Sequence, residues 1–373
     1  MNYNRMSIEI ESPEELGYDT IHYNLAESSV TDFRWEDLSL DLNGLMVSYG
    51  EHRGKQALRA LIASDSPGLA AQHVLTTTGA AMALFVVATT LLSANDHLVV
   101  VRPNYSTNLE TPRAIGCALT IIDLPFENGY RFDLAQVEQA LQPHTKLISI
   151  TNPHNPTGVV VEETLIEQLV ALAEARGIYL LVDETYRDLN FQTPLRPYVA
   201  ARSPQVISVC SLSKAFGVPG IRTGWLLCKD DTLMTNLLAA KEQITITNSV
   251  IDEEIAYQLL LRKEEILGSI HAQIRQNFAV LKAWFARQPY LDWVEPQAGV
   301  VCFPRLKAGY QLDAEAFYHS LYHDYHTLVG PGHWFEQAPT SFRLGFGYSP
   351  TDNFTEGLRR LEECLGRWVK EHW

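Results

Sequence analysis

The sequence predicts an α/β protein with a mainly parallel sheet and a smaller α+β region. Between about residue 50 and about residue 270, short apolar runs alternate with longer runs of helical periodicity. The 373 residues exceed what one hydrophobic core usually encloses, and an apolar content of 46% can fill two packed lobes. We therefore expect a large domain at 46–270, a small C-terminal domain at 271–373, and an N-terminal segment, 1–45, that packs on the small domain.

Helical periodicity separates several of the predicted strands. In residues 163–176 apolar side chains recur at i, i+3 and i+4, and Gly177 follows as the expected C-cap. A longer helical run, 264–289, leads into the second region. Alternation of this kind places helices on both faces of a parallel sheet. The predicted strands are residues 74–77, 98–102, 119–123, 146–152, 178–184, 206–211 and 224–229.

The charge balance argues against nucleic acid as a partner. The formal net charge is −15, with 44 acidic against 29 basic residues, so there is no basic surplus to neutralise phosphates. The chain start lacks a basic region followed by an apolar core, and the longest apolar runs are too short to span a bilayer. Five cysteines without a C-x-x-C pair indicate reduced thiols. We expect a cytoplasmic protein with no membrane partner.

A lysine lies in a hydroxyl-rich turn after the strand at 206–211, in the stretch SLSKAFGVPGIRTGW. Lys214 is therefore expected near the strand's carboxyl end, where open α/β sheets bind ligands. Ser211 and Ser213 can donate hydrogen bonds to a phosphate, and Arg222 can clamp it with a planar fork of donors. This combination indicates a site for pyridoxal phosphate, whereas the alternative is a solvated surface lysine.

Polar residues after two other strands supply further parts of such a site. Asp183 ends the strand at 178–184, where a carboxylate can pair with a pyridinium nitrogen and keep the ring an electron sink. Tyr186 and Asn155 can both hydrogen-bond the ring's phenolic oxygen. The alternatives are a loop cap for Asp183 and an ordinary turn for residues 152–158.

The segment after the first predicted strand offers an anion site. Thr78, Gly79 and Ala80 lead into an apolar helix, whose first N–H groups can hold the cofactor phosphate opposite Arg222. Tyr105 follows the strand at 98–102, where an aromatic ring can stack on the pyridine face.

In this order the motifs resemble the class I/II aminotransferase family of fold-type I pyridoxal-phosphate enzymes, over nearly the whole chain. The resemblance implies a mainly parallel seven-stranded sheet flanked by helices, plus a smaller α+β domain. It also implies that Lys214 is the Schiff-base lysine, Asp183 the pyridinium partner, Asn155 and Tyr186 the phenolate donors and Tyr105 the stacking ring. The implied phosphate-binding residues are Gly79, Ala80, Ser211, Ser213 and Arg222.

Two further residues carry the resemblance beyond the cofactor. Arg343, in SFRLGFG, resembles the arginine that binds the substrate α-carboxylate, and a bidentate guanidinium suits a planar carboxylate. The alternative for Arg343 is a surface salt bridge. Tyr49 resembles the tyrosine that reaches the neighbouring subunit's phosphate, which implies a homodimer with shared active sites.

The N-terminal segment departs from the family pattern. Family members usually carry a glycine over the substrate, whereas this segment reads NLAESSV, with Glu27, Ser28 and Ser29. A carboxylate there would disfavour acidic substrates and favour polar or cationic ones. The alternative is a Glu27 that faces solvent. Ala80 also stands where a hydroxyl residue is often found, although its backbone amide still serves.

The resemblance implies an aminotransferase that moves the amino group of an amino acid to a 2-oxo acid, with these small molecules as its partners. The same residues also serve elimination, cyclisation or decarboxylation, because the cofactor supplies the electron sink whichever bond is cleaved. A lyase or cyclase of specialised amino-acid metabolism is therefore an open alternative. A non-catalytic sensor of pyridoxal phosphate is another, although the chain shows no DNA-binding region.

Three histidines near the C-terminus form a possible metal pattern. His319, His323 and His326 recur at i, i+4 and i+7, which predicts one face of a helix. Phe317 and Leu321 in the same run favour a partly buried amphipathic helix instead. We therefore expect no metal site.

Overall fold

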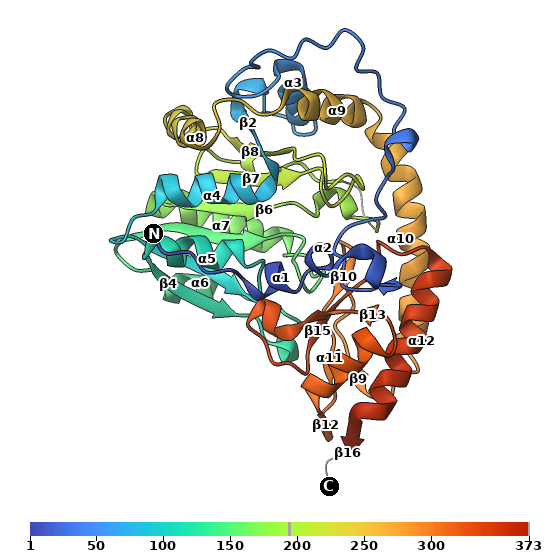
Figure 1. Cartoon of the computed structure of the whole chain (residues 1–373). Coiled ribbons are helices and arrows are strands. Elements are labelled where there is room, and N and C mark those ends of the chain that lie inside the picture. The colour runs from blue at the N-terminus through green and yellow to red at the C-terminus, as the bar shows by residue number, and fades with distance from the viewer. Residues whose placement is uncertain (193–194, 372–373) are drawn as a thin grey trace.

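A seven-stranded sheet forms the centre of the larger part of the protein in the computed structural model, which describes residues 1–192 and 195–371 (Figure 1). Its strands are β2 (Val74–Thr77), β3 (His97–Arg102), β4 (Ala118–Asp123), β5 (Thr145–Thr151), β6 (Tyr179–Asp183), β7 (Val206–Ser211) and β8 (Gly224–Cys228). Their order is β2-β8-β7-β6-β5-β3-β4, and neighbours are parallel except where β8 is involved. The predicted α/β class is confirmed, and all the predicted strands are present.

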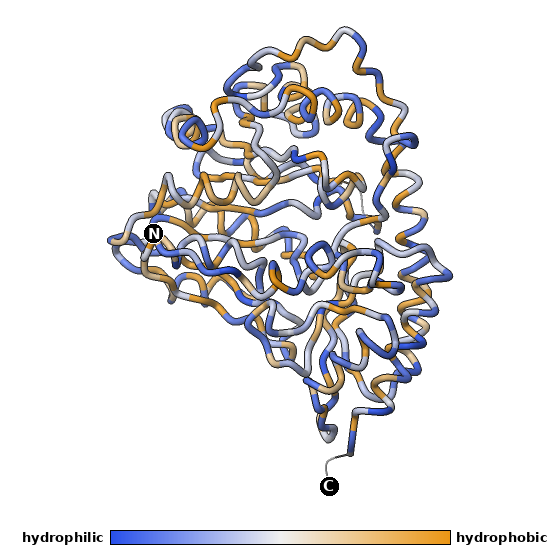
Figure 2. The backbone as a smooth tube through the Cα atoms, in the orientation of Figure 1, coloured by the Kyte–Doolittle hydropathy of each residue, from blue (hydrophilic) through white to orange (hydrophobic). Residues whose placement is uncertain are grey.

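Each face of the sheet has its own hydrophobic core. In β6, Leu180 and Val182 belong to one core and Leu181 to the other, because successive side chains of a strand point to opposite faces. This explains why the central strands are apolar along their length rather than alternating. Figure 2 shows the apolar colour concentrated along these strands.

Helices cover both faces of the sheet. Apolar residues of α4 join one core and those of α7 the other. Gly177 ends α7 in the left-handed conformation at φ 61°, as its position after the periodic run predicts. The helices of this part are α3 (Gln56–Ser64), α4 (Gly79–Leu91), α5 (Thr107–Ile115), α6 (Leu134–Ala140), α7 (Glu163–Arg176), α8 (Asp231–Ile244) and α9 (Val250–Leu261).

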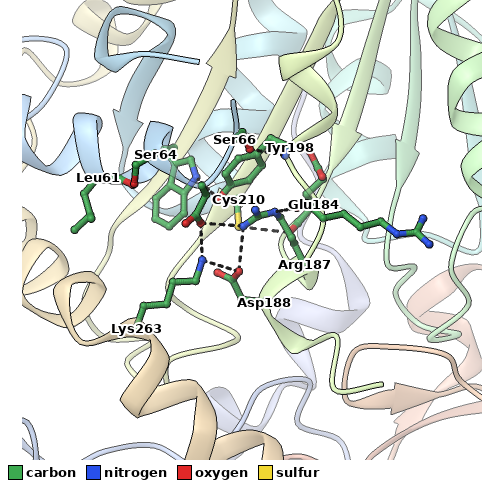
Figure 3. A network of polar contacts seen from close by, with 12 residues as sticks. Leu61, Ser64, Ser66, Glu184, Arg187, Asp188, Tyr198, Cys210 and Lys263 are labelled. Carbon is green, nitrogen blue, oxygen red and sulfur yellow. Dashed lines mark hydrogen bonds and ion pairs between the residues drawn. The ribbon is translucent and has the colours of Figure 1, made fainter. Parts of the chain in front are cut away.

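A long helix, α10 (Lys263–Phe285), runs from the sheet into the C-terminal part of the protein (Figure 1). Lys263 forms an ion pair with Asp188 at 3.0 Å, and Arg187 contacts the same carboxylate at 3.1 Å (Figure 3). Both cations also contact Asp65, at 2.5 Å from Lys263 and at 3.1 Å from Arg187. Because Arg187 and Asp188 are buried, removing one partner would leave an uncompensated charge. The network therefore fixes the start of α10 to the segment that follows β6.

The C-terminal part combines short strands with two more helices. A three-stranded antiparallel sheet has the order β10-β15-β14, and β9 pairs with β11 and β12 with β16. Residue 270, where we expect the large domain to end, lies inside α10, and the domain boundaries stay a prediction. The elements are β9 (Leu291–Asp292), β10 (Val301–Cys302), β11 (Arg305–Leu306), β12 (Tyr310–Leu312), α11 (Ala314–His323), β13 (Thr327–Leu328), β14 (Gly330–Pro331), β15 (Phe342–Gly345), α12 (Thr351–Trp368) and β16 (Val369–Glu371).

The N-terminal segment crosses between the two parts. It contains α1 (Ser7–Ile10), α2 (Pro13–Leu16) and β1 (Tyr23–Asn24), and β1 pairs in parallel with β13 of the C-terminal part. Further along, the amide of Val30 donates to the carbonyl of Lys214 at 3.2 Å. The segment therefore runs past the carboxyl end of β7. None of the helices in the described ranges is both long and apolar enough to cross a membrane.

The structure corrects the expectation for the three histidines. The helix α11 ends at His323, because the amides of both Asp324 and Tyr325 close on the carbonyl of Ser320. His326 lies beyond this end at φ 49° and does not continue the helical face. Within the part of the chain that the structure describes, no group of histidine, cysteine, aspartate and glutamate side chains is arranged to hold a metal ion.

Candidate active site

A pocket of about 460 Å³ opens at the carboxyl ends of the parallel strands, under the N-terminal segment. It collects side chains from β6, β7, β15, the start of α4 and the helices α1 and α2. Of the predicted site residues, Gly79 and Tyr49 do not line it. Those that do are Glu27, Ala80, Tyr105, Asn155, Asp183, Tyr186, Ser211, Ser213, Lys214, Arg222 and Arg343.

Lys214 lies in the turn that follows β7, with 30% of its side chain exposed. Its Nζ donates to Ser28 Oγ at 3.1 Å and lies 4.0 Å from Glu27 Oε1. The backbone of the turn is held by Leu212, whose amide donates to the carbonyl of Thr223 and whose carbonyl accepts from Phe216. An amine in this position is free to react with a carbonyl group placed in the pocket.

Asp183 ends β6 at the floor of the pocket, with 4% of the residue exposed. It accepts hydrogen bonds from the amide of Thr185 at 3.1 Å and from its hydroxyl at 2.6 Å, so it does cap the following turn. Burial raises the pKa of the Asp183 carboxyl above its ordinary value. A protonated ring nitrogen would supply a positive charge that stabilises this buried carboxylate.

Two neutral groups near Asp183 have donor capacity to spare. The Tyr186 hydroxyl is buried and has no hydrogen-bond partner within the described residues, which is costly unless a ligand supplies one. Asn155 is also buried, and its Oδ1 accepts from Arg343 at 3.3 Å, which leaves its amide group as the donor. Both would suit the phenolic oxygen of a ring placed in this pocket.

The start of α4 and the side chain of Arg222 form an anion site. Arg222 Nη1 donates to Ser213 Oγ at 3.1 Å and to the carbonyl of Pro219 at 2.8 Å. Gly79 opens the helix at φ 75°, and a Cβ there would lie 2.4 Å from Arg222 Nη2. Only glycine leaves room for the guanidinium at this point. With the helix N-terminus and Ser211 nearby, the arrangement suits a phosphate.

Tyr105 follows β3 and lines the pocket beside Asp183 and Lys214, whose charges both act on its hydroxyl. Burial raises the pKa of this phenol. The buried side chain of Asn104 holds the turn: its Oδ1 accepts from the amide of Tyr105 at 2.8 Å and from Thr151 Oγ1 at 3.0 Å. The backbone that carries the ring is therefore fixed at the wall of the pocket.

Arg343 projects from β15 and is only 4% exposed. Its guanidinium donates to Asn155 and, at 2.8 Å, to the carbonyl of Ala26. Its Nε has no partner within the described chain, and burial lowers the pKa of the group. The surface salt bridge considered from the sequence is therefore wrong, because this arginine is buried against neutral acceptors. It is placed to receive a carboxylate.

The structure also brings residues to the pocket that sequence reasoning missed. Trp334 lines it from the C-terminal part, and Thr185 lines it next to Asp183. One group of missed residues comes from α1, α2 and the turns beside them, which have no recognisable motif and reach the site only through tertiary folding. They are Ile8, Glu9, Ser12, Pro13, Glu14 and Tyr18.

Tyr49 lies away from the pocket of its own chain. It is 84% exposed in the segment that precedes α3. Its predicted contact with a neighbouring subunit's phosphate stays a prediction.

These donors and charges fit pyridoxal 5′-phosphate, because the unpartnered Tyr186 hydroxyl, the buried Asp183 carboxyl and the Gly79–Arg222 anion site each match one part of it. Fold and pocket together define a pyridoxal-phosphate enzyme of fold type I. Residues 34–361 match the family described as aminotransferase class I and II. The chain belongs to this family, and pyridoxal phosphate is its cofactor.

Relatives of the chain include enzymes of two kinds. Capreomycidine synthase from Streptomyces vinaceus is 29% identical over 327 residues, which cover 87% of this chain and 83% of that protein. The crystal structure of a PLP-dependent aminotransferase from Streptococcus suis superposes with a TM-score of 0.90 at 28% identity and covers 100% of both chains. The structure of the PLP-dependent cyclase OrfR gives a TM-score of 0.88 at 26% identity and covers 98% of each chain.

Proposed function

We propose that the protein is an aminotransferase, which moves the α-amino group of an amino acid to a 2-oxo acid at the pocket around Lys214. The observation that carries this proposal is the buried guanidinium of Arg343 in the same pocket as the lysine amine. An α-amino acid whose carboxylate binds Arg343 would present its α-carbon within the pocket that Lys214 lines.

When bound, pyridoxal phosphate supplies an electron sink for the bonds of the α-carbon. In this proposal Arg222, Ser211, Ser213 and the first amides of α4 hold its phosphate. Asp183 keeps the proton on the ring nitrogen. The Asn155 amide and the Tyr186 hydroxyl donate to the phenolic oxygen, and the ring of Tyr105 covers one face.

The remaining steps belong to Arg343 and Lys214. Arg343 fixes the substrate by its carboxylate, so that the α-carbon cannot turn away from the lysine. The amine of Lys214 would take the α-proton of the substrate and pass it on within the pocket. The N-terminal segment covers the pocket with α1 and α2 and limits the access of water.

A half-reaction tests the proposal. Protein loaded with pyridoxal phosphate is mixed with one amino acid at a time, without any oxo-acid acceptor. We expect one equivalent of 2-oxo acid per active site, after which the reaction stops until a second oxo acid is added. The Lys214→Ala protein should form none. Continued release of ammonia without acceptor would contradict transamination.

A cyclase or lyase is the second candidate, and two observations favour it. Glu27 places a carboxylate 4.0 Å from the Lys214 amine, where it can move protons at substrate atoms beyond the α-carbon. In addition, relatives of the chain include capreomycidine synthase and the cyclase OrfR. In the same experiment, this candidate predicts repeated turnover without an acceptor, with a ring product or a released fragment.

We also propose that the protein is a homodimer that shares its active sites. Three large apolar side chains of the segment before α3 are exposed to solvent, namely Met46 at 77%, Val47 at 75% and Tyr49 at 84%. Exposed apolar side chains this close together mark an interaction surface. A second copy that covers them would bring Tyr49 to the neighbouring pocket, as the resemblance implies.

A cytoplasmic location completes the proposal. All five cysteines are free and buried, which suits a compartment where thiols stay reduced. Fractionation of the producing cells tests this, and recovery of the protein outside the cytoplasmic fraction would contradict it.

A further inference from the structure

Three carboxylates of the N-terminal segment line the pocket in addition to Asp183. Glu27 lies deepest, with 13% of its side chain exposed and Lys214 4.0 Å away. Glu9 of α1 is partly buried and lies close enough to Lys214 and Glu14 for their charges to act on it. Glu14 of α2 lies at the exposed rim. The acidic groups therefore extend from the reacting centre towards the mouth.

The backbone that carries Glu27 is fixed from three directions. The amides of Ala26 and Glu27 both donate to Asn24 Oδ1 at 3.1 Å. The carbonyl of Ala26 accepts from Arg343. A Cβ on Gly345 would lie 1.9 Å from the carbonyl oxygen of Glu27, so glycine lets β15 pack directly against this turn. If the backbone of Glu27 moved out to solvent, the contact between Ala26 and Arg343 and the packing against β15 would both be lost.

The carboxylate of Glu27 is held as well. Its Oε1 accepts from the amide of Ser28 at 3.1 Å, and its Oε2 from the hydroxyl of Tyr18 at 3.4 Å. Both contacts come from neutral donors, and each oxygen retains room for another donor. The group is thus oriented by neutral donors, and its ion pair with Lys214, at 4.0 Å, is long, so it can bind a further positive group.

The balance of acidic and basic side chains in the pocket lining indicates what the three glutamates bind. The basic side chains of the pocket lining, within the described residues, are Lys214, Arg222 and Arg343. Under the proposed function, Lys214 binds the cofactor's carbonyl carbon, Arg222 binds its phosphate and Arg343 binds the substrate carboxylate. The unpartnered Arg343 Nε and Tyr186 hydroxyl, both in this lining, independently mark it as a ligand site. Arg5, outside the lining, also acts on Glu9, but none of the three basic side chains of the described lining is left for Glu27, and the substrate would supply that charge.

We propose that the substrate is an amino acid whose side chain ends in a positive charge, an ammonium or guanidinium group, and that Glu27 binds this group with Glu9 and Glu14 beside it. This inference rests on the proposed use of the pocket for an α-amino acid. The same carboxylates exclude aspartate and glutamate, because like charges repel in a partly desolvated pocket.

Matched substrate pairs test the proposal in the holoenzyme. Arginine and citrulline have nearly the same shape, as do lysine and norleucine, but only the first of each pair is charged. We expect kcat/KM to favour the charged member by roughly 10-fold to 100-fold, the value of hydrogen bonds to a charged group. The Glu27→Gln variant should lose most of this preference. Glu15→Gln, on the same segment but in an exposed pair with Arg5 outside the pocket, should keep it.

A binding measurement separates this inference from the proposed reaction. The Lys214→Ala protein, loaded with pyridoxal phosphate, is titrated calorimetrically with arginine and with citrulline, with and without Glu27→Gln. Tighter binding of arginine that Glu27→Gln abolishes supports the inference even if no 2-oxo acid is ever formed. Equal affinity for the two ligands, or a preference that Glu27→Gln leaves unchanged, overturns it even if transamination is confirmed.

Discussion

Arg222 and Arg343 show how one residue type takes two roles according to its surroundings. Arg222 lies beside the N-terminus of α4 and two serines, a place for a dianionic phosphate. Arg343 lines the same pocket and contacts Asn155 and the N-terminal turn. Because the two arginines have different neighbours, we expect one to bind the cofactor and the other the substrate.

Truncating each arginine should therefore have a different effect. We expect Arg222→Ala to weaken the affinity for pyridoxal phosphate by about tenfold or more, since a charge-assisted contact is lost. Arg343→Ala should retain the cofactor and raise KM for the amino acid instead. Equilibrium dialysis gives the first quantity and steady-state kinetics the second. The opposite ranking would show that the two anion sites are exchanged.

Glu184, next to Asp183, should make stability depend on pH. It is buried, accepts from the amide of Val199 at 3.1 Å, and burial raises its pKa from 4.5 to about 7. A raised pKa means that the folded protein holds the proton more tightly than the unfolded chain. The protonated Glu184 carboxyl therefore contributes to the free energy of unfolding. This contribution is fully present below about pH 4.5 and is lost as the pH rises through about 7.

Glu184→Gln should remove this dependence, because the amide keeps the shape and does not titrate. We expect the fall in Tm between pH 4.5 and pH 7 to be clearly smaller in the variant than in the parent, corresponding to on the order of 1–3 kcal/mol. Thermal unfolding followed at a series of pH values measures it. Parallel curves for the two proteins would show that Glu184 does not titrate in this range.

At the level of elements, the strands and long helices are predictable because each shows its pattern within a short stretch of sequence. Residues 206–211 are mostly apolar because both faces of β7 are covered, and Gly177 marks the end of α7 by its backbone conformation. The two-residue strands of the C-terminal part and the four-residue helices α1 and α2 are too short for any period to show. The periodic pattern predicts His326 on the same helix as His319 and His323, because periodicity does not reveal where capping contacts end a helix.

The turn between β2 and α4 offers a test at this scale. Gly79→Ala adds a Cβ 2.4 Å from Arg222 Nη2 at φ 75°, so the guanidinium must move away from the anion site. We expect weaker binding of pyridoxal phosphate together with a lower Tm. Gly68→Ala is the control, because it has φ 87° but nothing within 4 Å of its added Cβ.

The control separates backbone strain from displacement of the arginine. Gly68→Ala should cost about 1–3 kcal/mol of stability and leave the cofactor affinity unchanged. If Gly79→Ala bound pyridoxal phosphate as well as Gly68→Ala does, the turn would not form part of the anion site.

For the whole molecule, most of the residues that the sequence predicts for the site line one pocket. Asp183 ends a strand and Lys214 and Asn155 each follow one, and the carboxyl ends of parallel strands meet at one edge of the sheet. Glu9 and Glu14 were not foreseen, because they reach the pocket only through the pairing of β1 with β13 and the packing of the N-terminal segment. Glu27 was singled out as a departure from the family, but only the fold shows that it faces inward.

The proposed dimer makes a prediction at the same scale. If Tyr49 acts on the neighbouring pocket, hybrids of Lys214→Ala and Tyr49→Phe chains contain one site with both lesions and one with neither. Mixing two nearly inactive proteins should then restore activity, up to roughly half the parental value for each hybrid dimer. Unchanged activity after subunit exchange has been confirmed by mass spectrometry would place Tyr49 in its own chain's site or in none.

The identity of the lysine that holds the cofactor tests the central claim most directly. The protein is loaded with pyridoxal phosphate, reduced with borohydride and digested, and the modified peptide is sequenced by mass spectrometry. We expect a single pyridoxyl group on Lys214, one per chain, and none in the Lys214→Ala protein. Stoichiometric labelling of any other lysine, or labelling that survives Lys214→Ala, would contradict the assignment of this pocket as the active site.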